Sequence, residues 1–372
     1  HLYDGYGVVS RDGSGALKYD FSRLDATVQD ILATGARPFL SLSYMPAAIS
    51  KGDIVDLPKD WGEWEQVVRA TVEHYSGINQ LNIPNVYYEA WNEPDLFGGY
   101  KIASGEKNYL TLYSHTAIGA KKAQNVNSFK LGGPATTALY KNWVDTFLNF
   151  VIKNNLKLDF YSWHRYDKDL AQYEDDWNSI YSWMDKHPEK ADLELFVTEW
   201  GHNSNVDSGY DGKFGAIHTL AVSRVMMGRI ARGFVFEVKD GPGTSQYWGR
   251  WGLLTNDKYG VPVKKPRYQA LQLLNSLGEN RVSVNGEGSW VKAIASETEG
   301  VFKTLIINYD PNGKHAESVP VTLENLPKLN FTYKRTDFLG GIKSQNVATT
   351  EATWRTIEYM APNSAAMFEV RF

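Results

Sequence analysis

The sequence predicts an α/β protein, a (β/α)8 TIM barrel followed by a C-terminal antiparallel β-sandwich. Up to about residue 278, short apolar runs alternate with amphipathic stretches, which is typical of a parallel sheet covered by helices. From about residue 281, alternating polar and apolar runs are separated by Gly, Asn and Pro without helix signals, which is typical of antiparallel sheets. Two glutamates follow different strand-like runs, and this favours a closed barrel over an open sheet.

Helices are predicted where apolar residues recur at helical spacing. In 23–34 the apolar residues Leu24, Val28 and Ile31 share one face, and Gly35 occupies the C-cap position. The other predicted helices are 61–74, 109–122, 143–153, 177–187, 214–230 and 266–277. The predicted barrel strands are 38–43, 85–90, 129–133, 159–163, 193–197 and 233–238.

Six strands are two fewer than a closed barrel needs, and the 85–90 strand corresponds to the fourth strand of such a barrel. The first two strands are therefore expected to precede this chain. Either an N-terminal segment was removed, or a separate N-terminal fragment completes the barrel, since a barrel without two strands exposes two sheet edges. We predict a catalytic barrel domain over 1–280 and a β-sandwich domain over 281–372.

Composition excludes several classes of protein. A net charge of −4 gives no basis for nucleic-acid binding, and no apolar run reaches the roughly 20 residues that span a bilayer. Without cysteine the chain has no disulfide and no thiolate metal site. No metal or nucleotide motif occurs, so no metal and no cofactor are expected. The compartment and the oligomeric state are left open, with an extracellular or periplasmic location favoured over a cytoplasmic one.

Two short motifs carry the chemistry. Trp-Asn-Glu-Pro (91–94) follows the 85–90 strand, and Thr-Glu-Trp-Gly (198–201) follows the 193–197 strand. Glutamates at the carboxyl ends of two parallel strands can flank one bond, as hydrolysis of a glycosidic linkage requires. A single glutamate at a strand end would usually be a solvated surface group, but the aromatic and amide neighbours here favour a catalytic pair. We therefore predict Glu93 and Glu199 as catalytic residues and a carbohydrate as the substrate.

Aromatic residues are abundant, with 12 Trp and 22 Tyr. Part of them fill a core, and those in Gly-rich loops suit the C–H faces of sugars. Trp200, directly after Glu199, and Trp248 and Trp251 in a late loop are candidates for sugar contacts. Glu89, four residues before Glu93, is expected to be a buried partner of a basic residue.

The chain resembles glycoside hydrolase clan A, and within it family 39, the family of β-xylosidases and α-L-iduronidases. The matching stretches cover most of residues 20–280 in the same order and spacing. They are 38–46, 88–94, 131–135, 159–164, 251–254, 266–268 and 273–278.

This resemblance implies a retaining O-glycosyl hydrolase acting by double displacement, with Glu93 as the acid/base and Glu199 as the nucleophile. It implies that Asn92 contacts the 2-hydroxyl of the sugar and that His164 and Tyr166 line the subsite around the nucleophile. His1 resembles the histidine that ends the second strand of the family.

The chain departs from the family after the last barrel strand. Family members commonly have a tryptophan platform there, whereas this chain has Phe-Glu-Val-Lys-Asp-Gly-Pro-Gly (236–243). Lys239 is a candidate contact for an acidic sugar, or it forms an ion pair with Glu237 or Asp240. The sequence therefore predicts a β-xylosidase-like hydrolase of a β-linked glycoside or polysaccharide. The alternatives are a uronidase, an endo-acting exopolysaccharide hydrolase and a non-catalytic carbohydrate-binding protein.

Overall fold

The computed structural model describes residues 3–372, and their contacts divide the chain into two units. The first unit comprises the residues up to Arg165 together with Asp176–Glu199 and Arg229–Phe234. The second comprises Tyr166–Asp175, Trp200–Gly228 and Val235–Phe372. The division into domains at residue 280 stays a prediction.

All helices except the short α1 (Tyr3–Tyr6), which was not predicted, overlap their predicted positions. The others are α2 (Ser22–Ala33), α3 (Trp61–Ser76), α4 (Tyr109–Lys121), α5 (Lys141–Lys153), α6 (Leu170–Met184), α7 (Lys213–Met226) and α8 (Pro266–Asn275), with short 3-10 turns at Pro188–Lys190, Ser208–Asp211 and Asp257–Tyr259. The start of α6 was predicted seven residues too late. The carboxylate of Asp169 accepts a hydrogen bond from the N–H of Ala171 at 3.0 Å, and this cap begins the helix earlier.

Side-chain caps and apolar faces explain the helices that flank the site. Asp60 precedes α3 and accepts from the N–H of Gly62, while Asn108 precedes α4 and accepts from the N–H of Leu110. The buried face of α3 includes Trp64, whose indole donates to a threonine on α4 at 2.9 Å. These contacts fix both helices beside the strands that they connect.

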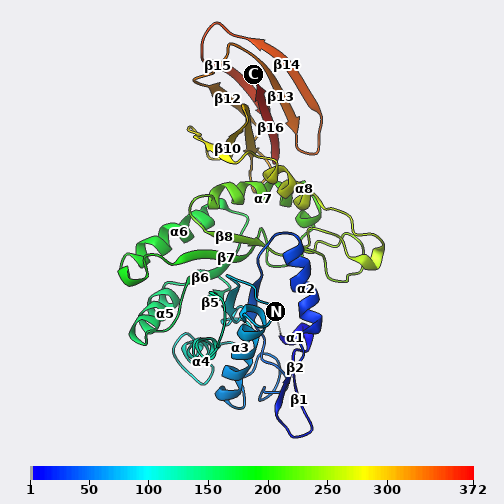
Figure 1. The fold of residues 1–372 in the computed structure, drawn as a ribbon. Helices are drawn as coiled ribbons and strands as arrows, with labels where there is room; N and C mark the ends of the chain where they lie inside the picture. Colours follow the sequence, from blue (N-terminus) through cyan, green and yellow to red (C-terminus); the bar gives the residue numbers. More distant parts are fainter. Residues whose placement is uncertain (1–2) are drawn as a thin grey trace. The chain divides into compact units, whose positions relative to one another are not determined.

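A parallel sheet forms the centre of the barrel region. Its strands are β3 (Phe39–Leu42), β4 (Tyr87–Ala90), β5 (Lys130–Thr136), β6 (Phe160–Tyr166), β7 (Glu194–Gly201) and β8 (Arg232–Val235), hydrogen-bonded in chain order (Figure 1). All six predicted barrel strands are present. Most residues of β4, β5 and β6 are buried, as expected where a parallel sheet is covered on both faces. The carboxyl ends of neighbouring strands therefore meet at one edge of this sheet.

Aromatic rings from five of these strands fill the concave side of the sheet near its amino end. The rings are those of Phe39, Tyr87, Phe160, Phe196 and Phe234. Phe39 on β3 and Phe234 on β8 come from the two outermost strands, yet their ring centroids are only 4.8 Å apart. The sheet therefore curls until its edge strands approach each other, as in a barrel.

A hairpin that the sequence did not reveal precedes the sheet. β1 (Val9–Arg11) and β2 (Leu17–Tyr19) pair antiparallel around the turn at residues 13–15. Each strand has three residues, which is too short for an alternating pattern to be recognised.

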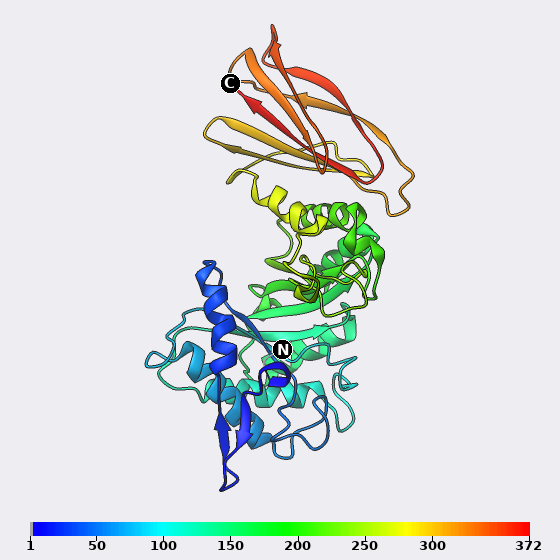
Figure 2. The same cartoon turned by 90° about the vertical axis from the view of Figure 1, so that its right-hand side faces the viewer.

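The C-terminal residues form the predicted antiparallel sheets. The strands are β9 (Asn280–Val282), β10 (Val291–Thr298), β11 (Val301–Asn308), β12 (Glu317–Leu323), β13 (Asn330–Asp337), β14 (Ile342–Ala348), β15 (Trp354–Met360) and β16 (Ser364–Arg371), coloured yellow to red in Figure 2. Six of them form one sheet, in the order β14-β13-β16-β11-β10-β9, and β12 pairs with β15 in a second sheet. Phe331, Tyr333, Met360 and Phe368 are in the shared core.

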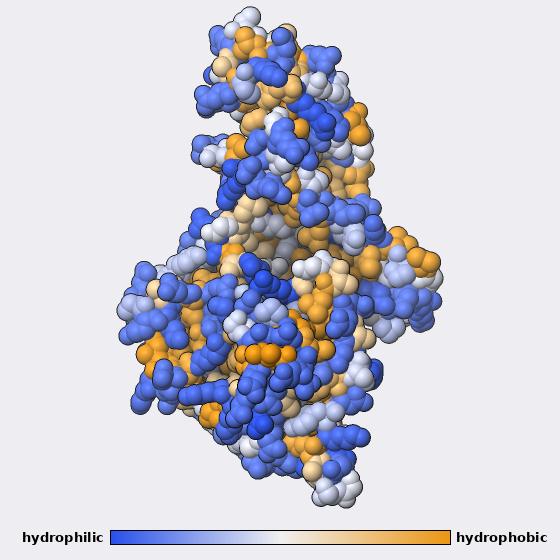
Figure 3. All heavy atoms as spheres, viewed as in Figure 1, coloured by the Kyte–Doolittle hydropathy of each residue, from blue (hydrophilic) through white to orange (hydrophobic). Residues whose placement is uncertain are grey.

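A cavity of about 810 Å³ lies within this sandwich and is lined by β-strand residues such as Val291, Phe302 and Val321. None of the predicted site residues lines it, so cavity size alone does not mark the chemistry of this chain. On the face shown in Figure 3, hydrophobic side chains are interspersed among hydrophilic ones. In the part of the chain that the structure describes, no helix has the length and apolar character that a membrane span needs.

Candidate active site

The backbone turns sharply where β4 ends. Trp91 and Glu93 have φ angles of 74° and 45°, a left-handed conformation that costs a non-glycine residue roughly 1–2 kcal/mol. The N–H of Glu93 donates to the carbonyl of Ala135 at 2.9 Å, and the Ser41 hydroxyl donates to the carbonyl of Trp91 at 3.0 Å. Contacts from the neighbouring strands β3 and β5 therefore hold the turn that presents Glu93.

Further hydrogen bonds, within residues 91–97 and to Tyr44, also hold the residues around Glu93. The N–H groups of Leu96 and Phe97 donate to the Glu93 carbonyl at 3.0 and 2.7 Å. The indole of Trp91, fully buried, donates to the carbonyl of Phe97 at 3.0 Å. Asn92, 5% exposed, donates from Nδ2 to the hydroxyl of Tyr44 at 2.9 Å. These hydrogen bonds fix the backbone of residues 91–97 and so the position from which the Glu93 side chain extends.

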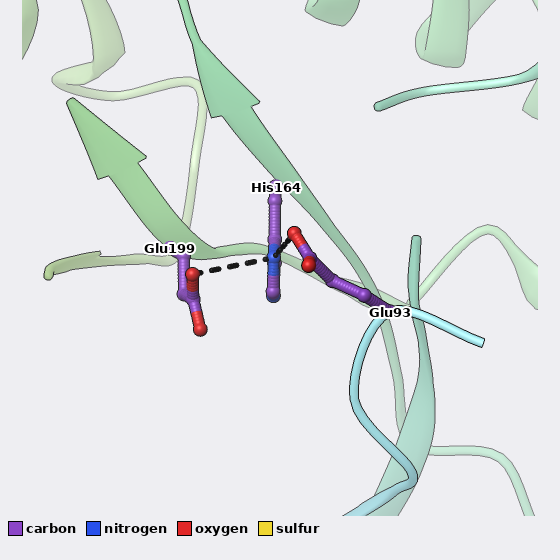
Figure 4. A group of neighbouring side chains, drawn as sticks. All are labelled: Glu93, His164 and Glu199. Atoms are coloured by element: carbon purple, nitrogen blue, oxygen red, sulfur yellow. Dashed lines mark hydrogen bonds and ion pairs between the residues drawn. The ribbon is translucent and has the colours of Figure 1, made fainter. Parts of the chain in front are cut away.

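The structure brings the second predicted glutamate to the same place. Glu199 lies near the end of β7, and His164, on β6, lies between the two glutamates (Figure 4). His164 Nδ1 is 2.9 Å from Glu93 Oε1 and 3.6 Å from Glu199 Oε2. The imidazole is only 1% exposed, against 12% and 18% for the two carboxyl side chains. His164 therefore spaces and orients both carboxyl groups, which keep contact with solvent.

The separation of the carboxyl groups decides which chemistry they support. One oxygen of Glu93 lies within 4.8 Å of one oxygen of Glu199. Carboxyl groups are about 5–5.5 Å apart in retaining glycosidases and about 6.5–9.5 Å apart in inverting ones, where a water must fit between them and the sugar. The short separation fits direct attack by one carboxylate.

Charge on the carboxyl groups controls the protonation of His164. Burial by itself lowers the pKa of this imidazole, but the nearby carboxylates of Glu199, Glu93 and Glu89 outweigh that effect and raise the pKa above its ordinary value. A protonated His164 places a positive charge between the two glutamates, and that charge stabilises whichever of them is ionised.

Glu89 is a third carboxyl group near this pair, four residues before Glu93 in the sequence. It is 3% exposed on β4, and burial raises its pKa from 4.5 to about 7. The positive charge of His164 and the hydroxyl groups of Ser162 and Thr198 oppose this rise. The basic residue predicted to accompany Glu89 is thus a histidine of the site itself, and Glu89 keeps its proton in mildly acidic solution.

This raised pKa predicts how stability depends on pH. Between pH 4.5 and pH 7 the unfolded chain releases the Glu89 proton while the folded chain retains it, so stability falls as pH rises through this window. Relative to Glu89→Gln, which has no proton to lose, the wild-type protein is expected to lose up to about 3 kcal/mol of stability between pH 4 and pH 8.

Urea transitions of both proteins, followed by tryptophan fluorescence at the two pH values, measure this difference. Glu351→Gln, at an exposed position of the sandwich, is the matched control and should follow the wild type. A wild-type protein that tracks Glu89→Gln at both pH values would show that Glu89 ionises normally in the folded state.

The three side chains of the site could also hold a metal ion. Glu93, His164 and Glu199 each offer one ligand atom, and these atoms lie within 4.8 Å of one another. Two carboxylates and one imidazole can bind a divalent transition metal. The absence of a metal from the mechanism therefore stays a prediction, which the effect of a chelator on activity would test.

Six of the predicted contact residues lie outside the first unit or outside the described residues, and Trp200, Tyr166 and His1 are three of them. Trp200 follows Glu199 on β7 and is 2% exposed. Tyr166 ends β6, and its ring lies against Gly201, where an added Cβ would be 3.2 Å from the ring. Both belong to the second unit. His1 lies outside the described residues, and all three roles stay predictions.

The two late tryptophans have an arginine between them. The guanidinium of Arg250 lies 5.3 Å from the ring centroid of Trp248 and 4.0 Å from that of Trp251. Trp248 is half-buried and packs against Gly243, and Trp251 donates from its indole to the Asn203 carbonyl at 3.2 Å. The guanidinium of Arg250 thus covers part of both tryptophan rings, and less of their surface is left for stacking against a sugar than the sequence suggested.

Lys239 forms an ion pair, but with a different partner from those predicted. Its ammonium lies 3.3 Å from Asp257, and both side chains are largely exposed. The predicted partners are engaged elsewhere: Glu237 pairs with Arg250 at 3.3 Å, and Asp240 pairs with the buried Lys265 at 3.0 Å. The prediction of Glu237 or Asp240 was wrong because a basic residue distant in sequence reaches each of them.

The fold and the pair of closely spaced carboxyl groups define a barrel glycosidase. A model of the family "Glycosyl hydrolases family 39" matches residues 1–196, more than half of the chain. The chain belongs to glycosyl hydrolases family 39.

Two curated relatives are β-xylosidases. The protein of Caldicellulosiruptor saccharolyticus is 27% identical over 345 residues, covering 83% of this chain and 67% of the relative. That of Geobacillus stearothermophilus is 27% identical over 319 residues, covering 76% of this chain and 61% of the relative. The alignments thus span about two thirds or less of these relatives' own length.

Solved structures share the fold over the whole chain. A monomeric β-xylosidase from Caulobacter crescentus CB15 matches with a TM-score of 0.80 at 20% identity, covering 100% of this chain and 88% of the other. A family 39 enzyme from Xanthomonas axonopodis pv. citri matches with a TM-score of 0.78 at 19% identity, covering 100% and 86%. The predicted family, barrel-and-sandwich fold and enzyme class, a β-xylosidase-like O-glycosyl hydrolase, are confirmed, and the substrate is a carbohydrate.

Proposed function

We propose that the chain hydrolyses a β-linked xyloside with retention of configuration, using Glu199 as the nucleophile and Glu93 as the acid/base. The observation that carries this assignment is the separation of at most 4.8 Å between an oxygen of each glutamate, with His164 between them. The names of the two curated relatives support a xyloside as the substrate class.

The first step transfers the sugar to the enzyme. The Glu199 carboxylate attacks the anomeric carbon while Glu93 donates its proton to the glycosidic oxygen, so that the C–O bond breaks and the aglycone leaves as an alcohol. The product of this step is a glycosyl ester of Glu199. His164, at hydrogen-bond distance from Glu93, stabilises the carboxylate that the proton transfer leaves behind.

The second step returns the enzyme to its starting state. Glu93, now ionised, takes a proton from a water molecule that attacks the anomeric carbon, and the Glu199 carboxylate leaves. Two inversions at one carbon give net retention. A location outside the cytoplasm, in the periplasm or medium, accompanies this proposal as a prediction, since xylan is a polymer that cells meet outside.

A panel of aryl β-glycosides tests the proposal. We expect the β-xyloside to be hydrolysed with a higher kcat/KM than the glucoside, galactoside, mannoside, arabinoside and uronide, and proton NMR to show the β-anomer as the first product. Ten millimolar EDTA should leave the rate unchanged, because both steps use only proton transfer and carboxylate attack.

Each alternative has its own outcome in this panel. The α-anomer as first product would exclude a retaining mechanism, and preference for the uronide would indicate a uronidase. Loss of activity in EDTA with recovery on adding a divalent metal would assign Glu93, His164 and Glu199 to a metal centre. Binding of xylo-oligosaccharides without any turnover would indicate a carbohydrate-binding protein.

A further inference from the structure

A buried hydroxyl group contacts Asn92, the side chain predicted to bind the 2-hydroxyl of the sugar. Tyr44 follows β3 and is 7% exposed, and its hydroxyl accepts a hydrogen bond from Asn92 Nδ2 at 2.9 Å. Asn92 stands directly before Glu93 on the strained turn after β4. The contact therefore joins two strand ends at the carboxyl edge of the sheet, beside the reacting groups.

The ring of Tyr44 is held in place independently of its hydroxyl. It packs edge-on against Trp91, with centroids 5.3 Å apart, and against Phe97 at 5.6 Å. Because the ring is fixed on two sides, the hydroxyl has a defined position, and a hydrogen bond to it restrains the carboxamide of Asn92. The terminal torsion of an asparagine otherwise has a broad distribution.

An asparagine amide has two N–H donors and one carbonyl acceptor. One N–H of Asn92 is used by Tyr44, so the plane of the amide is set and the second N–H and the carbonyl point in fixed directions. A hydrogen-bond donor whose direction is fixed in advance lowers the activation barrier most where its contact strengthens in the transition state. Contacts to the 2-hydroxyl strengthen in this way in glycosidases.

We propose that Tyr44 is a positioning residue for the glycosidase reaction: its hydroxyl orients the Asn92 amide toward the 2-hydroxyl of the sugar. This inference rests on the proposed function, because it assumes a sugar bound between Glu93 and Glu199. Tyr44 acts through Asn92, and the substrate contact is made by the amide.

Tyr44→Phe removes the hydroxyl and keeps the ring. With an aryl β-xyloside, kcat/KM is expected to fall about 5- to 10-fold, the size of one lost hydrogen bond that leaves a buried donor unpaired. With the corresponding 2-deoxy glycoside, the same substitution should change kcat/KM less than about twofold, because the group that Asn92 addresses is absent. A general structural defect would lower both values alike.

A double-mutant cycle with Asn92→Ala makes a second measurement that needs only the normal substrate. Adding Tyr44→Phe to Asn92→Ala is expected to cause no further loss, since the hydroxyl then has no amide to orient. An additional 5- to 10-fold loss in the double variant would overturn the proposal, as would equal losses on the two substrates or no loss on either.

The chain offers a matched control. Tyr100 packs against the same Trp91 with centroids 5.5 Å apart, is 1% exposed, and its hydroxyl has no hydrogen-bond partner among residues 3–372. Tyr100→Phe should retain wild-type kinetics on both substrates. Failure of the proposed function is separately visible, because the wild-type protein itself would then show no retaining turnover, whereas failure of this inference leaves wild-type turnover intact.

Discussion

Replacing Glu199 with glutamine is expected to lower kcat on an aryl β-xyloside by about 10⁴-fold or more, because removal of a nucleophile leaves only binding and electrostatic effects. Glutamine keeps the volume of the side chain and removes its charge. The fold should survive, since Glu199 is part of no apolar core and its charge is close to two other carboxyl groups. Circular dichroism and a thermal scan establish that point before the kinetics are compared.

A covalent label identifies the nucleophile directly. An activated 2-deoxy-2-fluoro xyloside should form the glycosyl ester rapidly and lose it slowly, because fluorine destabilises the positively charged transition states and the good leaving group compensates only in the first step. Mass spectrometry of the intact protein and of its peptides should find one added sugar on Glu199. A label on any other residue would reject this assignment.

Glu194→Gln is the matched control for these measurements. Glu194 lies on the same strand, β7, but at its other end, where it accepts a hydrogen bond from Tyr87 at 3.3 Å and pairs with Lys130 at 3.8 Å. Its loss should leave kcat and labelling unchanged. A large effect at both positions would indicate that β7 tolerates no change of charge, and the loss at Glu199 would then say nothing about chemistry.

The fold and the approximate site could be predicted because both depend on patterns that are local in sequence. Six apolar runs separated by amphipathic stretches specify parallel strands, and Glu93 and Glu199 each follow such a run directly. The carboxyl ends of parallel strands meet at one edge, so proximity of the two glutamates follows from the strand assignment alone. No knowledge of loop structure was needed.

The remaining features depend on contacts between residues far apart in sequence or on burial. Arg250 lies between Trp248 and Trp251, and nothing in their spacing indicates that a cation will lie on the rings. The raised pKa of Glu89 comes from burial, with a smaller contribution from the carboxyl group of Glu199 on another strand. The Tyr44–Asn92 hydrogen bond joins residues 48 positions apart. Such contacts follow from the folded geometry, and single-sequence patterns carry little signal for them.

Glu93→Ala is expected to act differently on the two steps of the reaction. For an unactivated xylo-oligosaccharide the loss in kcat/KM should be about 10²- to 10⁴-fold, the usual value of general acid catalysis. For an aryl glycoside whose leaving group needs no proton, kcat/KM should change little while kcat falls, because water then attacks the glycosyl ester without a base. Equal losses on both substrates would contradict an acid/base role.

Azide gives a stereochemical test of the same residue. In Glu93→Ala the glycosyl ester of Glu199 forms on the α face, so azide entering the space left by Glu93 attacks the β face, restores turnover and yields a β-xylosyl azide. In Glu199→Ala the vacant space lies on the opposite face, and azide should yield the α product. Opposite configurations from the two variants require that the two glutamates flank one anomeric carbon, as their separation of at most 4.8 Å allows. The same configuration from both variants, or no azide product from Glu93→Ala, would mean that the roles are assigned wrongly, however close the carboxyl groups lie.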